Sequence, residues 1–206
     1  MDTVIPGLHA SAPHPLPFAR SLLVRSFLLE REAGNLIVYG AEATPSLEGA
    51  THRYLGHWHE AMFAADLDGI PTLVHERDRE PAEQRASVDG TFSERSTLDG
   101  DFELIPIPGH TAGATAFLWD SGAHRALFTG DSIYLVEDEW VVAVDVSGAD
   151  RDAYLESLAL MRELEFDVLV PWAATVGRPP HAFTDAVDAR RRIDAIVDRV
   201  RRGESR

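Results

Sequence analysis

Three short stretches decide the fold of this 206-residue chain: LGHWHEAM (residues 55–62), PGHTAG (residues 108–113) and FTGD (residues 128–131). In each, a histidine or an aspartate comes just after an apolar, β-rich run, at the end of a predicted strand. In the first stretch, one residue separates His57 from His59. Because side chains two positions apart in extended backbone point the same way, both imidazoles can reach one ion.

The second and third stretches each place a glycine before the polar residue. Gly109 precedes His110 and Gly130 precedes Asp131, so the backbone can turn sharply and present each side chain beyond its strand. Taken alone, each motif is more typical of an ordinary turn or a surface histidine. Their order and separation in one chain predict a single set of metal ligands: His57, His59, His110 and Asp131.

Hydrophobic periodicity predicts strands and helices in mixed order. The runs 20–30 and 36–39, joined by a turn with Gly34 and Asn35, predict a β-hairpin. Further strands are predicted over residues 70–75, 102–108, 114–119, 126–129, 140–146 and 167–171. Helices are predicted over residues 60–69 and 76–86, from the N-cap Asp150 onward, and from about Thr184 onward. This order favours an α+β fold, with helices packed outside antiparallel-rich sheets.

No internal linker divides the chain, so residues 1–206 are expected to form one domain. Residues 1–18 are rich in proline and small side chains and predict an extended arm lying over the body. The last helix carries an apolar stripe that could pack in the core or serve a homodimer. The stripe consists of Ile193, Ile196, Val197 and Val200.

Composition excludes several kinds of chemistry and partner. The net charge of −15 repels phosphate backbones and anionic lipid, so neither nucleic acid nor a membrane is an expected partner. With no cysteine there is no thiolate nucleophile or thiolate ligand, and with no lysine there is no Schiff base. No apolar run approaches the length of a membrane helix and no signal-peptide pattern opens the chain, which predicts a cytoplasmic protein.

The three stretches, in this order, resemble the metallo-β-lactamase superfamily across nearly the whole chain. The hairpin SFLLEREAGNLIVYG matches the family's opening, LGHWHEAM partly matches its H-x-H-x-D-H loop, and PGHTAG and FTGD match its next two motifs. The resemblance implies a four-layer αββα sandwich with the site along one edge, between the two sheets. It also implies that His57, His59 and His110 bind one metal.

The departures from the family pattern fall on the second metal site. Ala61 and Met62 stand where the first loop has aspartate and histidine, and Ala173 stands where a later loop has histidine. Of the ligands that the family uses for a second metal, only the shared Asp131 remains. The resemblance therefore implies one intact metal site and a degenerate second one.

These observations predict a mononuclear metal-dependent hydrolase of an unidentified small molecule, with esters and thioesters as candidate substrates. One divalent metal, zinc before iron, is the expected cofactor, because three imidazoles with an open fourth position suit a zinc-bound water. Asp131 could be the fourth ligand, orient that water or act as a base, and Glu60 is a second candidate base.

Two other functions use the same residues. Two histidines and a carboxylate (His57, His110 and Asp131) could form a facial triad for an iron dioxygenase. Alternatively, the losses at Ala61 and Met62 could mark a non-catalytic binding protein.

Overall fold

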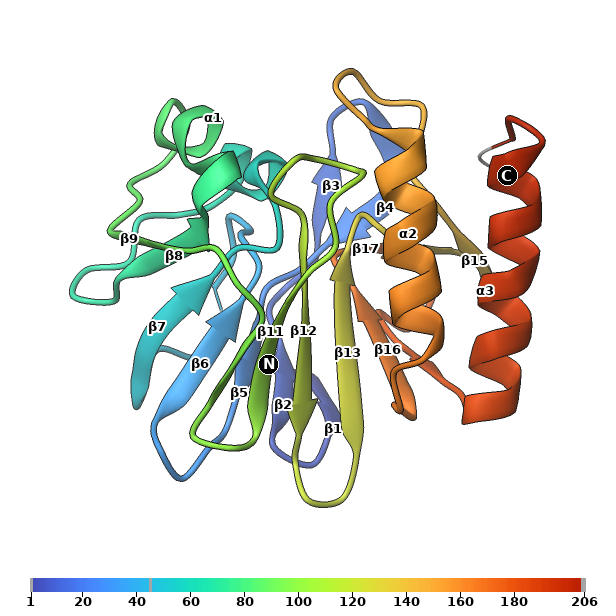
Figure 1. Cartoon of the computed structure of the whole chain (residues 1–206). Helices are drawn as coiled ribbons and strands as arrows, with labels where there is room; N and C mark the ends of the chain where they lie inside the picture. The colour runs from blue at the N-terminus through green and yellow to red at the C-terminus, as the bar shows by residue number, and fades with distance from the viewer. Residues whose placement is uncertain (1, 45, 205–206) are drawn as a thin grey trace.

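Two layers of β-sheet form the centre of the molecule, with helices outside them (Figure 1). The computed structural model describes residues 2–44 and 46–204. The first sheet has seven strands, in the order β1 (Asp2–Ile5), β2 (Leu8–Ala10), β5 (Phe27–Leu29), β6 (Asn35–Val38), β7 (Ala50–Tyr54), β8 (Thr72–His75) and β9 (Gly90–Phe92). The second has six, in the order β10 (Ser96–Leu98), β11 (Phe102–Pro106), β12 (Thr115–Asp120), β13 (Arg125–Gly130), β16 (Val168–Pro171) and β18 (Ala182–Phe183).

A third, smaller sheet links the two layers at one end. Its five strands run in the order β15 (Glu139–Val141), β14 (Tyr134–Val136), β17 (Ala173–Thr175), β4 (Ala19–Val24) and β3 (His14–Leu16). Only Trp172 separates β16 of the second sheet from β17 of the small sheet, and only Arg25 and Ser26 separate β4 from β5. The chain therefore passes directly from the large sheets into the small one.

The inner core lies between the first and second sheets. Alternating residues of the strands point into it, because successive side chains of a strand face opposite sides of the sheet. The buried aromatic members of this core are Phe27, Tyr39, Tyr54, Phe102, Phe117, Trp119, Phe128 and Trp172. Several of their rings meet edge-on, with 5.9–6.1 Å between the ring centroids of Phe27, Tyr39 and Phe128.

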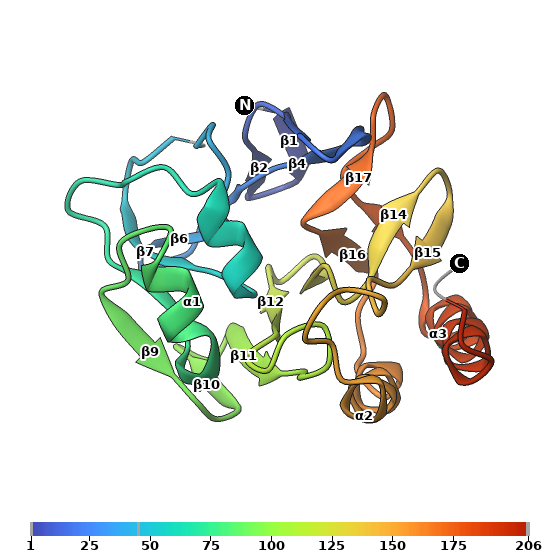
Figure 2. The same cartoon turned by 90° about the horizontal axis from the view of Figure 1, so that it is seen from above.

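Two long helices cover the outer face of the second sheet (Figures 1 and 2). In α2 (Arg151–Arg162), the Asp150 side chain accepts hydrogen bonds from the backbone N–H groups of Asp152 and Ala153, which confirms the predicted N-cap. In α3 (Ala186–Arg201), the predicted stripe is buried at Ile193, Ile196 and Val200, against the second sheet. No helix within the described residues has the length and the hydropathy that crossing a bilayer requires.

The layer outside the first sheet is thinner. It contains the 3₁₀ helices η1 (Trp58–Met62) and η2 (Glu76–Asp78) and the short helix α1 (Arg79–Glu83). Leu28 and Ile37 on the outer face of this sheet pack against Ile70, which lies in the loop between η1 and β8. The predicted α+β sandwich with helices on both outer sides is confirmed, with unequal outer layers.

The prediction of a helix over residues 60–69 is wrong. Only η1 forms, and the chain then continues as a loop, because neighbouring elements satisfy its backbone groups. The N–H of Ala65 donates to the carbonyl oxygen of Ala41, and the carbonyl oxygen of Ala65 accepts from Arg53 Nη1 at 2.6 Å. These partners replace those that a continuing helix would supply.

Other boundaries differ at the edges of the sheets. The predicted hairpin is confirmed as β5 and β6, which pair antiparallel. Residues 2–16, expected as part of an extended arm, are extended but pair into the sheets as β1, β2 and β3. The strand predicted over residues 140–146 is limited to β15, and the chain then leaves the sheet to line the site.

Candidate metal centre

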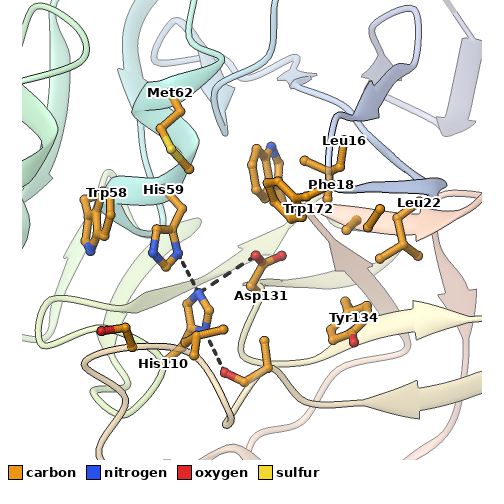
Figure 3. A pocket seen from close by; sticks show the side chains of 15 residues that line it. Leu16, Phe18, Leu22, Trp58, His59, Met62, His110, Asp131, Tyr134 and Trp172 are labelled. Atoms are coloured by element: carbon orange, nitrogen blue, oxygen red, sulfur yellow. Dashed lines mark hydrogen bonds and ion pairs between the residues drawn. The ribbon is translucent and has the colours of Figure 1, made fainter.

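Four predicted ligand residues meet at one end of the sandwich, three of them on loops that follow strands and His59 on η1. His57 and His59 follow β7, His110 lies between β11 and β12, and Asp131 follows β13. One nitrogen from each imidazole and one oxygen from the carboxylate all lie within 4.8 Å of one another. The structure thus brings together residues that are up to 74 positions apart (131 − 57) in the sequence. Figure 3 shows His59, His110 and Asp131 turned toward a common centre.

His57 is oriented by a buried carboxylate. Its Nδ1 lies 2.9 Å from Glu60 Oε1, and both side chains are buried. Its Nε2 is turned toward the centre, 3.5 Å from Asp131 Oδ2, and is buried with no hydrogen-bond partner among the described residues. A buried ring nitrogen without a partner is costly unless something binds it. This orphaned atom fits a metal ligand whose other ring nitrogen is held by a carboxylate.

The hydrogen bonds of His110 fix which of its nitrogens faces the centre. Nδ1 lies 2.8 Å from the carbonyl oxygen of Ala143, which can only accept, so Nδ1 carries the hydrogen and Nε2 presents a lone pair. That Nε2 lies 2.9 Å from His59 Nδ1 and 3.8 Å from Asp131 Oδ2. Because Nε2 of His110 accepts, His59 Nδ1 donates the hydrogen of this bond, and it would lose that hydrogen on binding a metal. The donor set is three imidazole nitrogens and one carboxylate oxygen, which suits zinc or iron.

Two glycines allow the loops to approach this closely. Gly109 has φ 142°, and a Cβ there would lie 2.5 Å from Tyr154 Cα. Gly130 has φ 56°, and a Cβ there would lie 3.2 Å from His57 Nδ1. Both positions combine a backbone conformation that favours glycine with a lack of space for a side chain. The predicted sharp turns before His110 and Asp131 are confirmed.

The charges at the centre shift the pKa values in opposite directions. Burial by itself lowers the pKa of His57, but the Asp131 and Glu60 carboxylates on either side raise it to about 10. Burial and the neighbouring His57 lower the pKa of His59 to about 3 and that of His110 to about 4. Burial would raise the pKa of Asp131, yet the adjacent histidines hold it below its usual value. At neutral pH, two rings are neutral and the carboxylate is ionised.

Glu60 occupies a different place from the one predicted for a base. Its side chain is 0% exposed, and its carboxylate accepts from the N–H groups of Gly40 and Gly56 at 3.1–3.2 Å, besides contacting His57. It lies behind the His57 ring and does not line the pocket. A carboxylate so engaged cannot reach a substrate, which corrects the expectation that Glu60 could be a base. Its position is that of a group that orients His57.

Asp78 is a positioning residue that the sequence did not indicate. Its carboxylate is buried and joins the two histidine-bearing loops. Oδ2 accepts from the N–H of Trp58 at 3.0 Å and from Thr111 Oγ1 at 2.6 Å, and Oδ1 accepts from the N–H of Gly113 at 2.7 Å. Asp78 lies in the segment 76–86 predicted to be helical, and nothing in its spacing marks it.

The end of the hairpin is tied to the loop that carries Asp131. The hydroxyl of Tyr39 donates to the carbonyl oxygen of Val170 at 2.7 Å and accepts from the N–H of Gly130 at 2.8 Å. On the other side of the same loop, the Tyr154 hydroxyl contacts the carbonyl oxygen of Ser132 at 2.5 Å. Two buried tyrosines thus hold the backbone on both sides of Asp131.

Three of the four ligand residues, His59, His110 and Asp131, line a pocket of about 550 Å³, and His57 is buried behind them (Figure 3). Trp58 and Met62 line it from η1, and Trp172 lines it from the junction of two sheets. Trp172 is fixed by its indole N–H, which donates to the carbonyl oxygen of Gly40 at 2.8 Å. Met62 and Ala173, two of the positions where a second-site ligand is missing, line this pocket. Ala61, the third, is a buried residue of η1 and does not line it. The metal centre therefore faces a pocket with apolar side chains in its lining.

The other histidines of the described residues lie outside this group. His75 Nε2 contacts the carbonyl oxygen of Ser93, and His124 pairs with Asp167. Within residues 2–44 and 46–204, the four ligands form the single cluster of three or more histidine or acidic residues whose ligand atoms converge in this way.

A model of the metallo-β-lactamase superfamily matches residues 33–173 of the chain, a span that includes all four ligands. The chain belongs to this superfamily. The recognition drawn from the three sequence stretches is thereby confirmed. No relative was found among curated protein sequences.

Solved structures of the superfamily share the fold. The DIM-1 metallo-β-lactamase has a TM-score of 0.71 and 17% identity, and the match covers 96% of this chain and 95% of that one. The FIM-1 enzyme of Pseudomonas aeruginosa, in its mono-zinc form, has a TM-score of 0.71 and 14% identity, with 98% and 94% covered. An archaeal superfamily protein from Sulfolobus tokodaii has a TM-score of 0.60 and 18% identity, with 92% and 85% covered. At these identities, the likeness extends to the fold alone.

Proposed function

We propose that this protein is a mononuclear metal-dependent hydrolase that cleaves esters or thioesters of a small molecule. The observation that carries the proposal is the convergence of three imidazole nitrogens and the Asp131 carboxylate, with His59, His110 and Asp131 lining a pocket. The donors are pre-oriented, since Glu60 holds His57 and the carbonyl oxygen of Ala143 holds His110. Such support is typical of a metal-binding site.

A divalent metal bound by these residues would supply a Lewis acid and an activated water at neutral pH. Asp131 is the carboxylate that lines the pocket, and its lowered pKa keeps it ionised there. It can orient the attacking water and hold the proton that the water loses. The water oxygen bonds to the acyl carbon, the bond from that carbon to the leaving oxygen or sulfur breaks, and the proton passes to the leaving atom.

The proposal specifies one metal per chain. Ala61 and Ala173 offer no donor atom, and the Met62 thioether is a weak ligand for zinc. One of the structural neighbours, the FIM-1 enzyme, is described in a mono-zinc form, so this fold accommodates a single metal.

Metal content and turnover together test the proposal. The protein is purified without chelator, supplemented with zinc or iron, and analysed by mass spectrometry for metal. It is then assayed on p-nitrophenyl acetate and acetylthiocholine. We expect about one zinc per chain and hydrolysis that a chelator abolishes. Fewer than about one metal per ten chains would contradict the proposal. Iron binding with oxygen uptake on persulfides would instead support the dioxygenase alternative.

A further inference from the structure

The charged residues of the pocket lie on one side of it. Among the described residues that line the pocket, the histidines and acidic residues are His59, His110 and Asp131. All 19 basic residues of the chain are arginines, and no arginine within the described part of the chain lines the pocket. Beyond the metal centre, the cavity therefore offers an anion no cationic side chain.

The wall opposite the metal centre is apolar and comes from several elements. Figure 3 shows these side chains around the cavity: Leu16, Phe18, Leu22, Met62, Tyr134 and Trp172. Phe18 stands at the turn between β3 and β4 and is 76% exposed, although it lines the pocket. An exposed aromatic ring beside a cavity is available to cover a ligand.

We propose that this pocket binds the uncharged, apolar acyl part of the substrate and discriminates against acyl groups that end in a carboxylate or phosphate. This inference rests on the proposed hydrolase function and adds the substrate class. A terminal anion would lose its hydration against leucine, phenylalanine and tryptophan side chains. It would gain no cationic partner among the described lining residues, which offer neutral groups such as the hydroxyls of Tyr134 and Ser147. The net charge of −15 opposes its approach as well. A methyl-ended chain of the same length loses nothing polar and buries apolar surface.

Two esters that differ in one terminal group test the inference. p-Nitrophenyl hexanoate and the mono-p-nitrophenyl ester of adipic acid share the leaving group and the six-carbon acyl chain. One chain ends in a methyl group and the other in a carboxylate. We expect kcat/KM of the zinc-loaded enzyme to favour the hexanoate by at least about tenfold at pH 7.5. Equal values, or a preference for the adipate, would overturn the inference.

A binding measurement separates this inference from the hydrolase proposal. Trp58 and Trp172 line the pocket, so a bound ligand should change the tryptophan fluorescence. The probes are 1-hexanol and hexane-1-sulfonate, whose sulfonate is a poor metal ligand. We expect hexanol to bind at least about tenfold more tightly. If neither ester is cleaved but this difference holds, the hydrolase proposal fails and the pocket inference stands. If hexanol does not bind, or binds no better than the sulfonate, the inference fails.

Two exposed phenylalanines provide a matched pair of variants. Phe18 lines the pocket, whereas Phe183 is 60% exposed on β18 and does not line it. We expect Phe18→Ala to lower kcat/KM for the hexanoate by about threefold to tenfold while changing that for the acetate much less. Phe183→Ala should leave both values unchanged. Equal effects of the two variants on the hexanoate would count against the proposed acyl wall.

Discussion

The two sides of the pocket are built by different physical means. The metal-binding side consists of polar groups that are each held in place: His57 by Glu60, His110 by the carbonyl oxygen of Ala143, and the histidine-bearing loops by Asp78. On the apolar side, Leu16 and Leu22 are held by packing in the core. On the metal-binding side, hydrogen bonds fix the direction of each ligand side chain. On the apolar side, packing fixes only the shape of the wall.

This difference shows how one site can keep its chemistry while its specificity changes. Buried hydrogen bonds are directional and costly to leave unmade, so the ligand geometry tolerates little substitution. Apolar contacts are non-directional, and volume-conserving exchanges usually cost little. Substitutions on the polar side should therefore change metal affinity, and substitutions on the apolar side should change substrate choice. The predictions below test that separation.

Removing a ligand should have the largest effect. We expect His110→Ala to lower zinc affinity by more than about a hundredfold, because the loss of a direct ligand exceeds the usual effect of an outer-shell partner. His75→Ala is the matched control, since His75 is similarly buried but lies outside the ligand group. Competition with a chromogenic chelator measures both affinities. Equal losses would mean that His110 does not bind the metal.

Weakening the link that Asp78 makes between the two histidine-bearing loops should have the next largest effect on zinc affinity. Asp78→Asn keeps the shape of the side chain but replaces one acceptor oxygen with a donor, which cannot accept from Thr111 or Gly113. We expect about a tenfold to hundredfold loss of zinc affinity. We also expect the free energy of unfolding to fall by about 1–3 kcal/mol.

A helix-capping aspartate is the control for stability alone. Asp185→Ala removes the N-cap of α3 and should cost about 1 kcal/mol without changing zinc affinity. Urea denaturation and chelator competition on both variants separate the two effects. If Asp78→Asn loses stability but keeps its affinity, Asp78 does not position the ligands.

The ligands could be predicted from the sequence because their signals are local. An H-x-H pair in extended backbone and a glycine before His110 or Asp131 imply side-chain direction without any knowledge of the tertiary structure. The hairpin and the cap at Asp150 were predictable for the same reason, since both depend on neighbouring residues.

The residues that support the ligands could not be predicted in this way. Asp78 acts through Trp58, Thr111 and Gly113, which lie 20 to 35 positions away. Glu60 lies within the motif, but its direction depends on Gly40 of another loop. The false helix over residues 60–69 has the same origin, because partners from distant segments bind its backbone. Tertiary hydrogen bonds leave no pattern in the sequence.

Metal binding should release a proton from His57, and Glu60 should influence the number of protons released per metal bound. The pKa of His57 is raised to about 10, so its ring is protonated at pH 7.5 before metal binds. A metal ligand must be neutral, so binding should release about one proton, and zinc affinity should rise with pH over this range. Glu60→Gln removes one of the carboxylates that raise this pKa. We expect it to release fewer protons and to bind zinc about tenfold to hundredfold more weakly.

Isothermal titration calorimetry in buffers of different ionisation enthalpy gives the proton count directly. Asp66→Asn is the control, a carboxylate change at a residue outside the ligand group and the pocket. Identical proton release in Glu60→Gln and in the unchanged protein would show that the carboxylate behind His57 does not set its charge.

The apolar side should give the smallest effect on metal binding and the clearest contrast with the ligand side. Met62 lines the pocket and is 38% exposed, and no polar contact holds it. Met62→Leu conserves most of its volume, so we expect zinc affinity to change less than about twofold and stability to change by less than about 1.5 kcal/mol. Chelator competition and urea denaturation check both values. A large loss of zinc affinity would mean that the thioether takes part in the metal centre. Met62 would then belong to the metal-binding side of the pocket and not to the apolar side.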